Sequence, residues 1–229
     1  MKRIFACLPV FLALLSSPRF AAAQSTFDLN MGFGWANAKA LPGVDITTFG
    51  PCTSATTAGN CVTTPNLNSF MLGFGGNLMA WKLFGVGAEI KIQPTRQDYL
   101  TFQQQTPTQV GDVLQDRVTL WDVHGVLRPV SRKKAEIQLL GGIGGANVKF
   151  YEKLSSSGTI LGNANQTQFA GSSNHFQVHG GAGVQIYVSG NFYIRPQFDV
   201  HYVHNFTQFG RNTVFGGTIW IGYSLGDRQ

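Results

Sequence analysis

Two histidines and an aspartate in the C-terminal third of the chain have the residue types that bind metal ions or move protons. If the chain reverses at residues 189–191, antiparallel pairing places His179 directly opposite His201, with Asp199 two residues away on the same face. Two imidazoles and a carboxylate can ligate a transition metal or relay protons. The alternative, a pair of interior histidines satisfied by neighbours and water, is our expectation, so the sequence predicts neither a metal nor another cofactor.

A cysteine pair offers a second kind of chemistry. Cys52 and Cys61 lie close together in the sequence, and their spacing fits no four-ligand zinc motif. A lone close pair in an oxidising compartment usually forms a disulfide. We therefore expect a loop disulfide rather than a metal site.

Apolar residues recur at every second position in eight segments, which is the pattern of β-strands with one apolar and one polar face. Five segments alternate cleanly, at residues 27–35, 84–92, 175–188, 192–202 and 215–225. Three others, around residues 70–80, 113–128 and 135–151, are interrupted by apolar residues on the polar face: Met71, Met79, Val118, Leu120, Leu140 and Val148. The register of these three strands stays open.

The composition argues against a water-soluble sheet protein. Charged residues make up 12% of the chain, against about 25% in typical globular domains. A soluble β-sandwich or lipocalin gathers apolar residues in a core and exposes charged faces, whereas here the apolar faces are large and aromatic and the polar faces are rich in glycine. Aromatic residues near the strand ends are expected to form girdles at two membrane interfaces: Trp35, Trp81, Tyr99, Trp121, Tyr151, Tyr187, Phe192, Tyr202 and Tyr223.

Connection lengths indicate how the strands are joined. Short connections at residues 81–83, 129–134 and 189–191 alternate with long polar ones at 37–68, 99–112, 152–173 and 205–211. Short periplasmic turns, long outer loops and an even strand number are typical of bacterial outer-membrane barrels. The predicted fold class is all-β, an eight-stranded antiparallel up-and-down transmembrane β-barrel formed by residues 24–229.

Residues 1–23 have the three regions of a secretory signal peptide. A basic start precedes an apolar run from Ile4 to Leu15, and small residues follow at Ala21-Ala22-Ala23. The apolar run is shorter than the roughly 20 residues of a membrane helix, so we expect export and cleavage after Ala23. Without the basic residues of this leader the net charge falls below +6, and no nucleic-acid motif remains, so nucleic-acid binding is not expected.

The predicted inward faces carry charged side chains and histidines. An eight-stranded barrel is only just wide enough for its own side chains, so large-pore activity is not expected. Buried charges must be paired or hydrated; we favour an ion-pair network and keep a narrow, gated or water-filled path as the alternative. This lumen polar network consists of Asp28, Glu89, Lys91, Asp122, His124, Glu136, Arg195 and Asp199.

The leader, the eight strands, the aromatic content and the closing segment Gly217–Leu225 resemble the OmpA/OmpX-type family of small outer-membrane β-barrels. The resemblance covers nearly all of the chain after the leader, and its pattern is generic. The family's last strand commonly ends in an aromatic residue that the assembly machinery reads, whereas four residues follow Leu225 here. The resemblance implies a monomer in the bacterial outer membrane, in contact with membrane lipid, lipopolysaccharide and the assembly machinery, with loops open to an extracellular ligand.

Some barrels modify lipid A, and the segment Asp199–Asn205 is similar to the histidine-containing strand of lipid A deacylase. That enzyme has its nucleophilic serine two positions after the histidine, where this chain has Val203 and Phe206. We therefore expect no enzymatic activity. The predicted function is a structural or surface-interaction role without large-pore activity; the alternatives are an OmpW-like conduit for small hydrophobic molecules and a lipid A-modifying enzyme.

Overall fold

The computed structural model describes residues 26–39, 44–45, 61–62, 66–103, 110–156 and 165–226. The predicted signal peptide and Cys52, one half of the predicted disulfide, lie outside these residues. Within them, no helix is long and apolar enough to cross a membrane.

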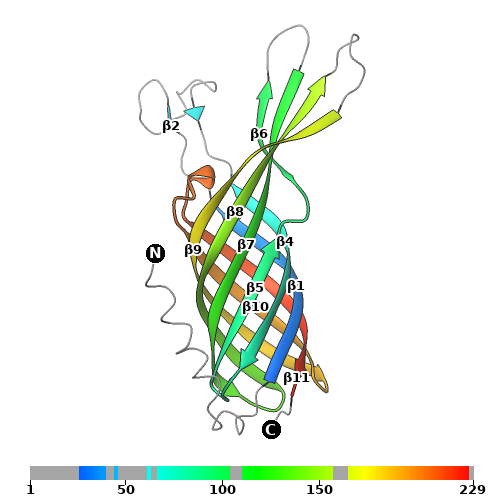
Figure 1. Ribbon diagram of the computed structural model, residues 1–229, viewed down its shortest axis with the longest axis vertical. Coiled ribbons are helices and arrows are strands. Elements are labelled where there is room, and N and C mark those ends of the chain that lie inside the picture. Colours follow the sequence, from blue (N-terminus) through cyan, green and yellow to red (C-terminus); the bar gives the residue numbers. More distant parts are fainter. Residues whose placement is uncertain are drawn as a thin grey trace, which may run out of the picture.

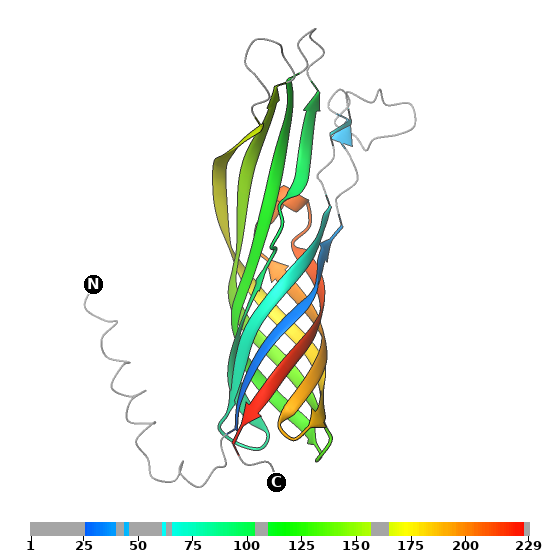
Figure 2. The same ribbon diagram turned by 90° about the vertical axis from the view of Figure 1, so that its right-hand side faces the viewer.

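Eight strands pair edge to edge in an antiparallel ring (Figures 1 and 2). In order around the ring they are β5 (Phe84–Ile92), β4 (Leu67–Met79), β1 (Thr26–Ala38), β11 (Thr213–Leu225), β10 (Phe192–Val203), β9 (Asn165–Ser189), β8 (Ala135–Ser156) and β7 (Val110–Ser131). The pairing of β7 with β5 closes the ring. The prediction of an eight-stranded antiparallel barrel is confirmed.

Three further strands lie outside this ring. β6 (Gln97–Gln103) continues the path of β5 and pairs with the part of β7 beyond the β5 pairing. β2 (Val44–Asp45) and β3 (Cys61–Val62) form a small separate pair. We call the end of the barrel that carries β6 the upper end, as it is drawn in Figure 1.

Successive residues of each strand face opposite sides of the barrel wall. On β1 burial alternates at every residue, so that Asp28 is fully buried while its neighbour Phe27 is 40% exposed. The outward apolar side chains of all eight strands form one continuous surface band, called here the apolar belt. Its members include Phe27, Leu29, Met31, Phe33, Trp35, Phe70, Leu72, Phe74, Leu78, Phe84, Val86, Ile90, Trp121, Val123, Ile137, Leu139, Ile143, Phe176, Val178, Val184, Ile186, Phe192, Ile194, Phe198, Phe215, Ile219, Ile221 and Tyr223.

The six apolar residues that interrupt the sequence pattern all face the interior. Four of them belong to a buried layer near the upper end, called the upper apolar layer, which comprises Ala36, Ala38, Leu67, Met71, Val118, Leu120, Ala146, Val148, Val203, Phe206, Phe209 and Val214. The other two, Met79 and Leu140, pack with Val126 in a lower apolar cluster. The polar side chains of the interior therefore lie between the upper apolar layer and the lower apolar cluster.

Strands β7, β8 and β9 continue past the belt and, with β6, form a projecting sheet at the upper end (Figure 2). The projecting sheet comprises residues 97–103, 110–117, 149–156 and 165–172, beyond the residues of β7 that pair with β5. Much of the predicted loops 99–112 and 152–173 is therefore strand. The sequence pattern did not predict these strands, because a sheet with no lipid on either face does not require one apolar face.

The connection between β10 and β11 folds against the upper end of the barrel interior. It contains the short 3-10 helix η3 (Thr207–Phe209), and Phe206 and Phe209 are buried in the upper apolar layer. The hydroxyl of Tyr99 donates a hydrogen bond to the Gln208 carbonyl. This segment, predicted as a long polar loop, instead packs two phenylalanines into the upper end of the interior.

The predicted aromatic girdles are partly wrong. Tyr99 packs edge-on against Phe150 and Phe209, with ring centroids 5.1 and 5.6 Å apart, rather than at the belt. Tyr151 lies in the projecting sheet, and Tyr187 turns partly inward, where its hydroxyl meets Ser224. The remaining members, Trp35, Trp81, Trp121, Phe192, Tyr202 and Tyr223, are exposed as predicted.

Candidate functional site in the barrel interior

The pairing of β9 with β10 places His179 opposite His201. The turn between these strands consists of Gly190 and Asn191, one residue fewer than predicted, and Gly190 has a φ of +54° that favours glycine. A bulge beside the turn skips Val188 and restores the register, so that Ile186 faces Ile194. Both histidines consequently point into the barrel and are buried.

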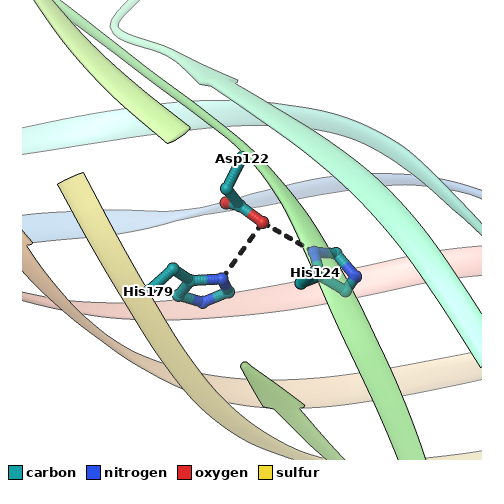
Figure 3. Close-up of side chains that lie close together, drawn as sticks. All are labelled: Asp122, His124 and His179. Carbon is teal, nitrogen blue, oxygen red and sulfur yellow. Dashed lines mark hydrogen bonds and ion pairs between the residues drawn. The ribbon is translucent and has the colours of Figure 1, made fainter. Parts of the chain in front are cut away.

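A carboxylate on β7 joins two of the interior histidines (Figure 3). One Asp122 oxygen lies 2.6 Å from Nδ1 of His124, which is two residues further along the same strand. The same oxygen lies 3.1 Å from Nδ1 of His179, which projects into the interior from β9, two strands away in the ring. Since all three side chains are buried, this carboxylate fixes the orientation of both imidazoles.

His179 also contacts the carboxylate of Asp199 on β10. Its Nε2 lies 2.9 Å from one Asp199 oxygen, which also accepts a hydrogen bond from Gln197 at 2.8 Å. The other Asp199 oxygen is ion-paired with the ammonium of Lys91. The ring of His201 stacks on His179, with centroids 4.6 Å apart and planes 12° from parallel.

Arg195 connects this cluster to the lower half of the interior. It donates to Glu89 and to the Gln138 amide oxygen, both at 2.8 Å. Glu89 also lies 3.8 Å from Lys91. All of these side chains are buried, so each charged group depends on its protein partners rather than on bulk water.

A second charged group lies near the lower end. Arg128 is ion-paired with Asp28 and lies 3.2 Å from Glu136. The hydroxyl of Ser224 donates to the second Asp28 oxygen, and an amide pair between Gln138 and Gln185 connects this group to Arg195. The polar side chains thus form one connected network along the barrel.

The structure buries all eight residues that were predicted to line the lumen and brings them into contact with other polar groups. The predicted lumen network omitted Arg128, Gln138 and Gln185. The sequence pattern puts Gln138 and Gln185 on the polar faces of their strands, and alternation from Asp122 and His124 puts Arg128 on the inward face. The inward Val126 between His124 and Arg128 concealed this signal.

Trp220 fills the centre of the barrel. It is fully buried, and a Cβ built on Gly32 or Gly73 would lie within 2.6 or 2.5 Å of its ring. The rings of Trp220 and the cations of Lys91 and Arg195 lie 5.8 and 5.5 Å apart, within the range of cation–π attraction. The glycines on the inward face therefore make room for an indole rather than for a solute.

Asp116 lies above the belt, at the base of the projecting sheet, and is buried. Burial is the main cause that raises the pKa of this carboxyl to about 6, and a hydrogen bond with Gln93 opposes the rise. Because the folded protein holds the proton more tightly than the unfolded chain, this group stabilises the fold at low pH. That contribution is lost as pH rises from about 4 through about 6.

Replacing Asp116 with asparagine is expected to remove this pH dependence. At pH 8 the variant gains up to roughly 3 kcal/mol in free energy of unfolding, and the gain vanishes near pH 4. Urea unfolding of the refolded protein in detergent at both pH values measures this difference. The half-exposed Glu152 on β8 supplies the control, since Glu152→Gln should change stability by less than about 0.5 kcal/mol. An unchanged pH slope in Asp116→Asn contradicts the prediction.

No protein-family model matches the sequence, and no curated protein matches it. Among solved structures, the chain is similar to Ail, the attachment invasion locus protein of Yersinia pestis, in complex with the heparin analogue sucrose octasulfate. The identity is 13%, the match covers 88% of this chain and 99% of that one, and the TM-score is 0.48. The N-terminal β-barrel domain of Pseudomonas aeruginosa OprF matches at 10% identity, covering 89% and 98% of the two chains, with a TM-score of 0.41. The outer membrane protein OprG of the same organism matches at 11% identity, covering 90% and 97%, with a TM-score of 0.42. The fold assignment rests on the strand pairing described above, which closes an eight-stranded antiparallel ring.

Proposed function

We propose that this chain is an exported outer-membrane barrel whose interior is a closed stabilising network and whose projecting sheet is an interaction surface outside the cell. The observation that carries the proposal is the inverted distribution of side chains. The outer wall is an apolar belt, while the buried interior holds charged and amide side chains. Water would oppose such an exterior, and lipid stabilises it.

The dimensions of the belt support a membrane-spanning position. The outward apolar residues of β1 run from Phe27 to Trp35, and those of β10 from Phe192 to Tyr202. A tilted strand needs about 9–11 residues to cross a bilayer, which matches both stretches. The short turns then face the periplasm and the projecting sheet faces outward.

A charge placed on the belt provides a direct test of the lipid environment. Met31→Arg is expected to lower the free energy of unfolding in lipid vesicles by about 2–4 kcal/mol. Phe169→Arg is the matched control, because Phe169 is 56% exposed and Met31 is 61% exposed, but Phe169 lies in the projecting sheet. Equal effects of the two substitutions would contradict a membrane position for the belt.

The projecting sheet has the features of a contact surface. Arg96 lies 4.0 Å above the ring of Tyr151, which packs edge-on against the exposed Phe169. Aromatic residues and arginine are enriched in protein interfaces. Within the described residues, β6 and the upper part of β9 each pair on one side only, so an extended segment of a partner can add to either edge.

Labelling of intact cells tests which end lies outside. With Cys52 and Cys61 replaced by serine, Lys149→Cys on the projecting sheet is expected to react with a membrane-impermeant maleimide. Arg132→Cys in a lower turn serves as the control, since it is equally exposed and should react only after the outer membrane is permeabilised. Labelling of Arg132→Cys alone on intact cells would refute the proposed surface role.

A conduit for small hydrophobic molecules is the second candidate, because the upper apolar layer could receive an apolar solute entering from the loop side. Uptake into liposomes that depends on Arg195 would support the conduit over the closed barrel. A lipid A-modifying activity has less support, since His201 points into the barrel and away from the lipid. Unmodified lipid A in expressing cells would remove that activity.

A further inference from the structure

We propose that the barrel interior binds one divalent transition metal ion, with Nε2 of His179, one ring nitrogen of His201 and Oδ1 of Asp199 as its protein ligands. These ligand atoms lie within 4.8 Å of one another, and all three residues are buried. Bonds of about 2.0–2.2 Å to nitrogen and oxygen place tetrahedral ligand atoms about 3.3 Å apart. Small rotations of side chains that already meet would therefore bring three protein ligands to the ion and leave the fourth tetrahedral position open.

His201 provides the observation that points to a ligand. It is 1% exposed, and neither of its ring nitrogens has a hydrogen-bond partner among the described residues. A buried polar group without a partner costs about 1–3 kcal/mol, and such groups are rare in native proteins. Coordination of a metal ion by one nitrogen removes this cost.

The surroundings of His179 match the arrangement of a metal-bound histidine. Its Nδ1 lies 3.1 Å from Asp122 (Figure 3), while its Nε2 faces Asp199. Metal-bound histidines almost always use one nitrogen for the ion and direct the other toward a carboxylate, backbone carbonyl or water. Asp122 is thus a positioning residue that leaves the Nε2 lone pair of His179 available for the ion.

The net charge of the buried side chains favours the binding of one divalent cation. Within the belt the described buried side chains include five carboxylates, Asp28, Glu89, Asp122, Glu136 and Asp199, and three cations, Lys91, Arg128 and Arg195. With neutral histidines the network therefore carries an excess of two negative charges, which one divalent ion balances. Lys91 holds Oδ2 of Asp199 and leaves Oδ1 on the side of the histidines.

Both the ligand set and the position restrict the ion and its route. Imidazole and carboxylate ligands suit zinc and copper rather than magnesium or calcium. The upper apolar layer and the fully buried Trp220 lie above and beside the site, so the ion is taken up while the barrel folds and not through an open mouth.

Copper incorporation during refolding tests the proposal. The mature protein is refolded into detergent micelles with Cu²⁺, passed over a chelating resin, and analysed for copper per chain and by electron paramagnetic resonance. We expect about one retained copper per chain and hyperfine splitting from two imidazole nitrogens. His201→Gln should lower retention at least tenfold, whereas His204→Gln, an exposed histidine three residues further on, should retain copper as the parent does.

His201→Gln should fold normally, because within the described part of the chain the His201 side chain makes no hydrogen bond that the substitution would break; a gel shift on boiling verifies this. The spectrum of the parent protein gives an independent readout that needs no variant. Copper retention below about a tenth per chain, a spectrum without nitrogen splitting, or equal retention in folded His201→Gln would each overturn the metal site. Failure of copper to bind would leave the proposed surface function untouched.

Discussion

Arg195→Ala is expected to destabilise the barrel by about 3–5 kcal/mol, because it removes the cation that is hydrogen-bonded to the buried Glu89 and leaves only Lys91, 3.8 Å away, near this carboxylate. Arg195 is fully buried and donates to Glu89 and Gln138. Its removal exposes no surface to water, so Glu89 must either stay charged in a medium that solvates it poorly or take up a proton. Urea unfolding in lipid vesicles, followed by tryptophan fluorescence, measures the loss.

The charge pair itself should be worth less than the single substitution suggests. The double variant Glu89→Gln/Arg195→Gln removes both charges and keeps hydrogen-bonding groups, so it should recover part of the loss caused by Arg195→Ala. A matched control is Arg132→Ala in the lower turn, which is exposed and should cost less than about 0.5 kcal/mol. A loss of under 1 kcal/mol for Arg195→Ala would show that water reaches the network.

Trp220→Ala is expected to cost about 3–5 kcal/mol, since it removes the largest fully buried side chain and leaves a cavity at the centre of the barrel. Gly32 and Gly73 lie directly against the indole, and neither has a side chain that could fill the gap. The same urea titration applies, with circular dichroism as the signal because the fluorescence of Trp220 is lost.

The glycine opposite the indole gives a coupled test of the same packing. Gly73→Ala puts a methyl group within 2.5 Å of the Trp220 ring and should cost about 1–3 kcal/mol. In the Trp220→Ala background the same substitution should cost little, because the added methyl group then lies in the cavity. Additive effects of the two substitutions would contradict direct packing between them.

The sequence was sufficient to predict the barrel because lipid and a crowded interior impose opposite requirements on alternate residues. Along β1 each outward residue from Phe27 to Trp35 is apolar and each inward residue is polar or small, so fold class and strand number followed from the pattern. The predicted pairing of His179 with His201 is observed although the turn was misplaced by one residue, because a bulge beside the turn compensates for the shift.

The remaining features depend on three-dimensional contacts that alternation does not encode. Met71 and Val118 interrupted the pattern because the upper end of the interior is apolar, a property that arises only when the β10–β11 connection folds into it. Arg128 was missed for the same reason at the lower end. The projecting sheet lacks a lipid-facing side, so its strands carried no signal that distinguished them from polar loops.

The continuity of β7, β8 and β9 has a mechanical consequence. Each strand runs from the lower turns, through the wall, into the projecting sheet, so the projecting sheet and the barrel wall share three continuous strands. A pull applied to the tip along the strands loads many ladder hydrogen bonds in parallel shear rather than breaking them one after another. The projecting sheet is therefore expected to move with the barrel as one stiff body.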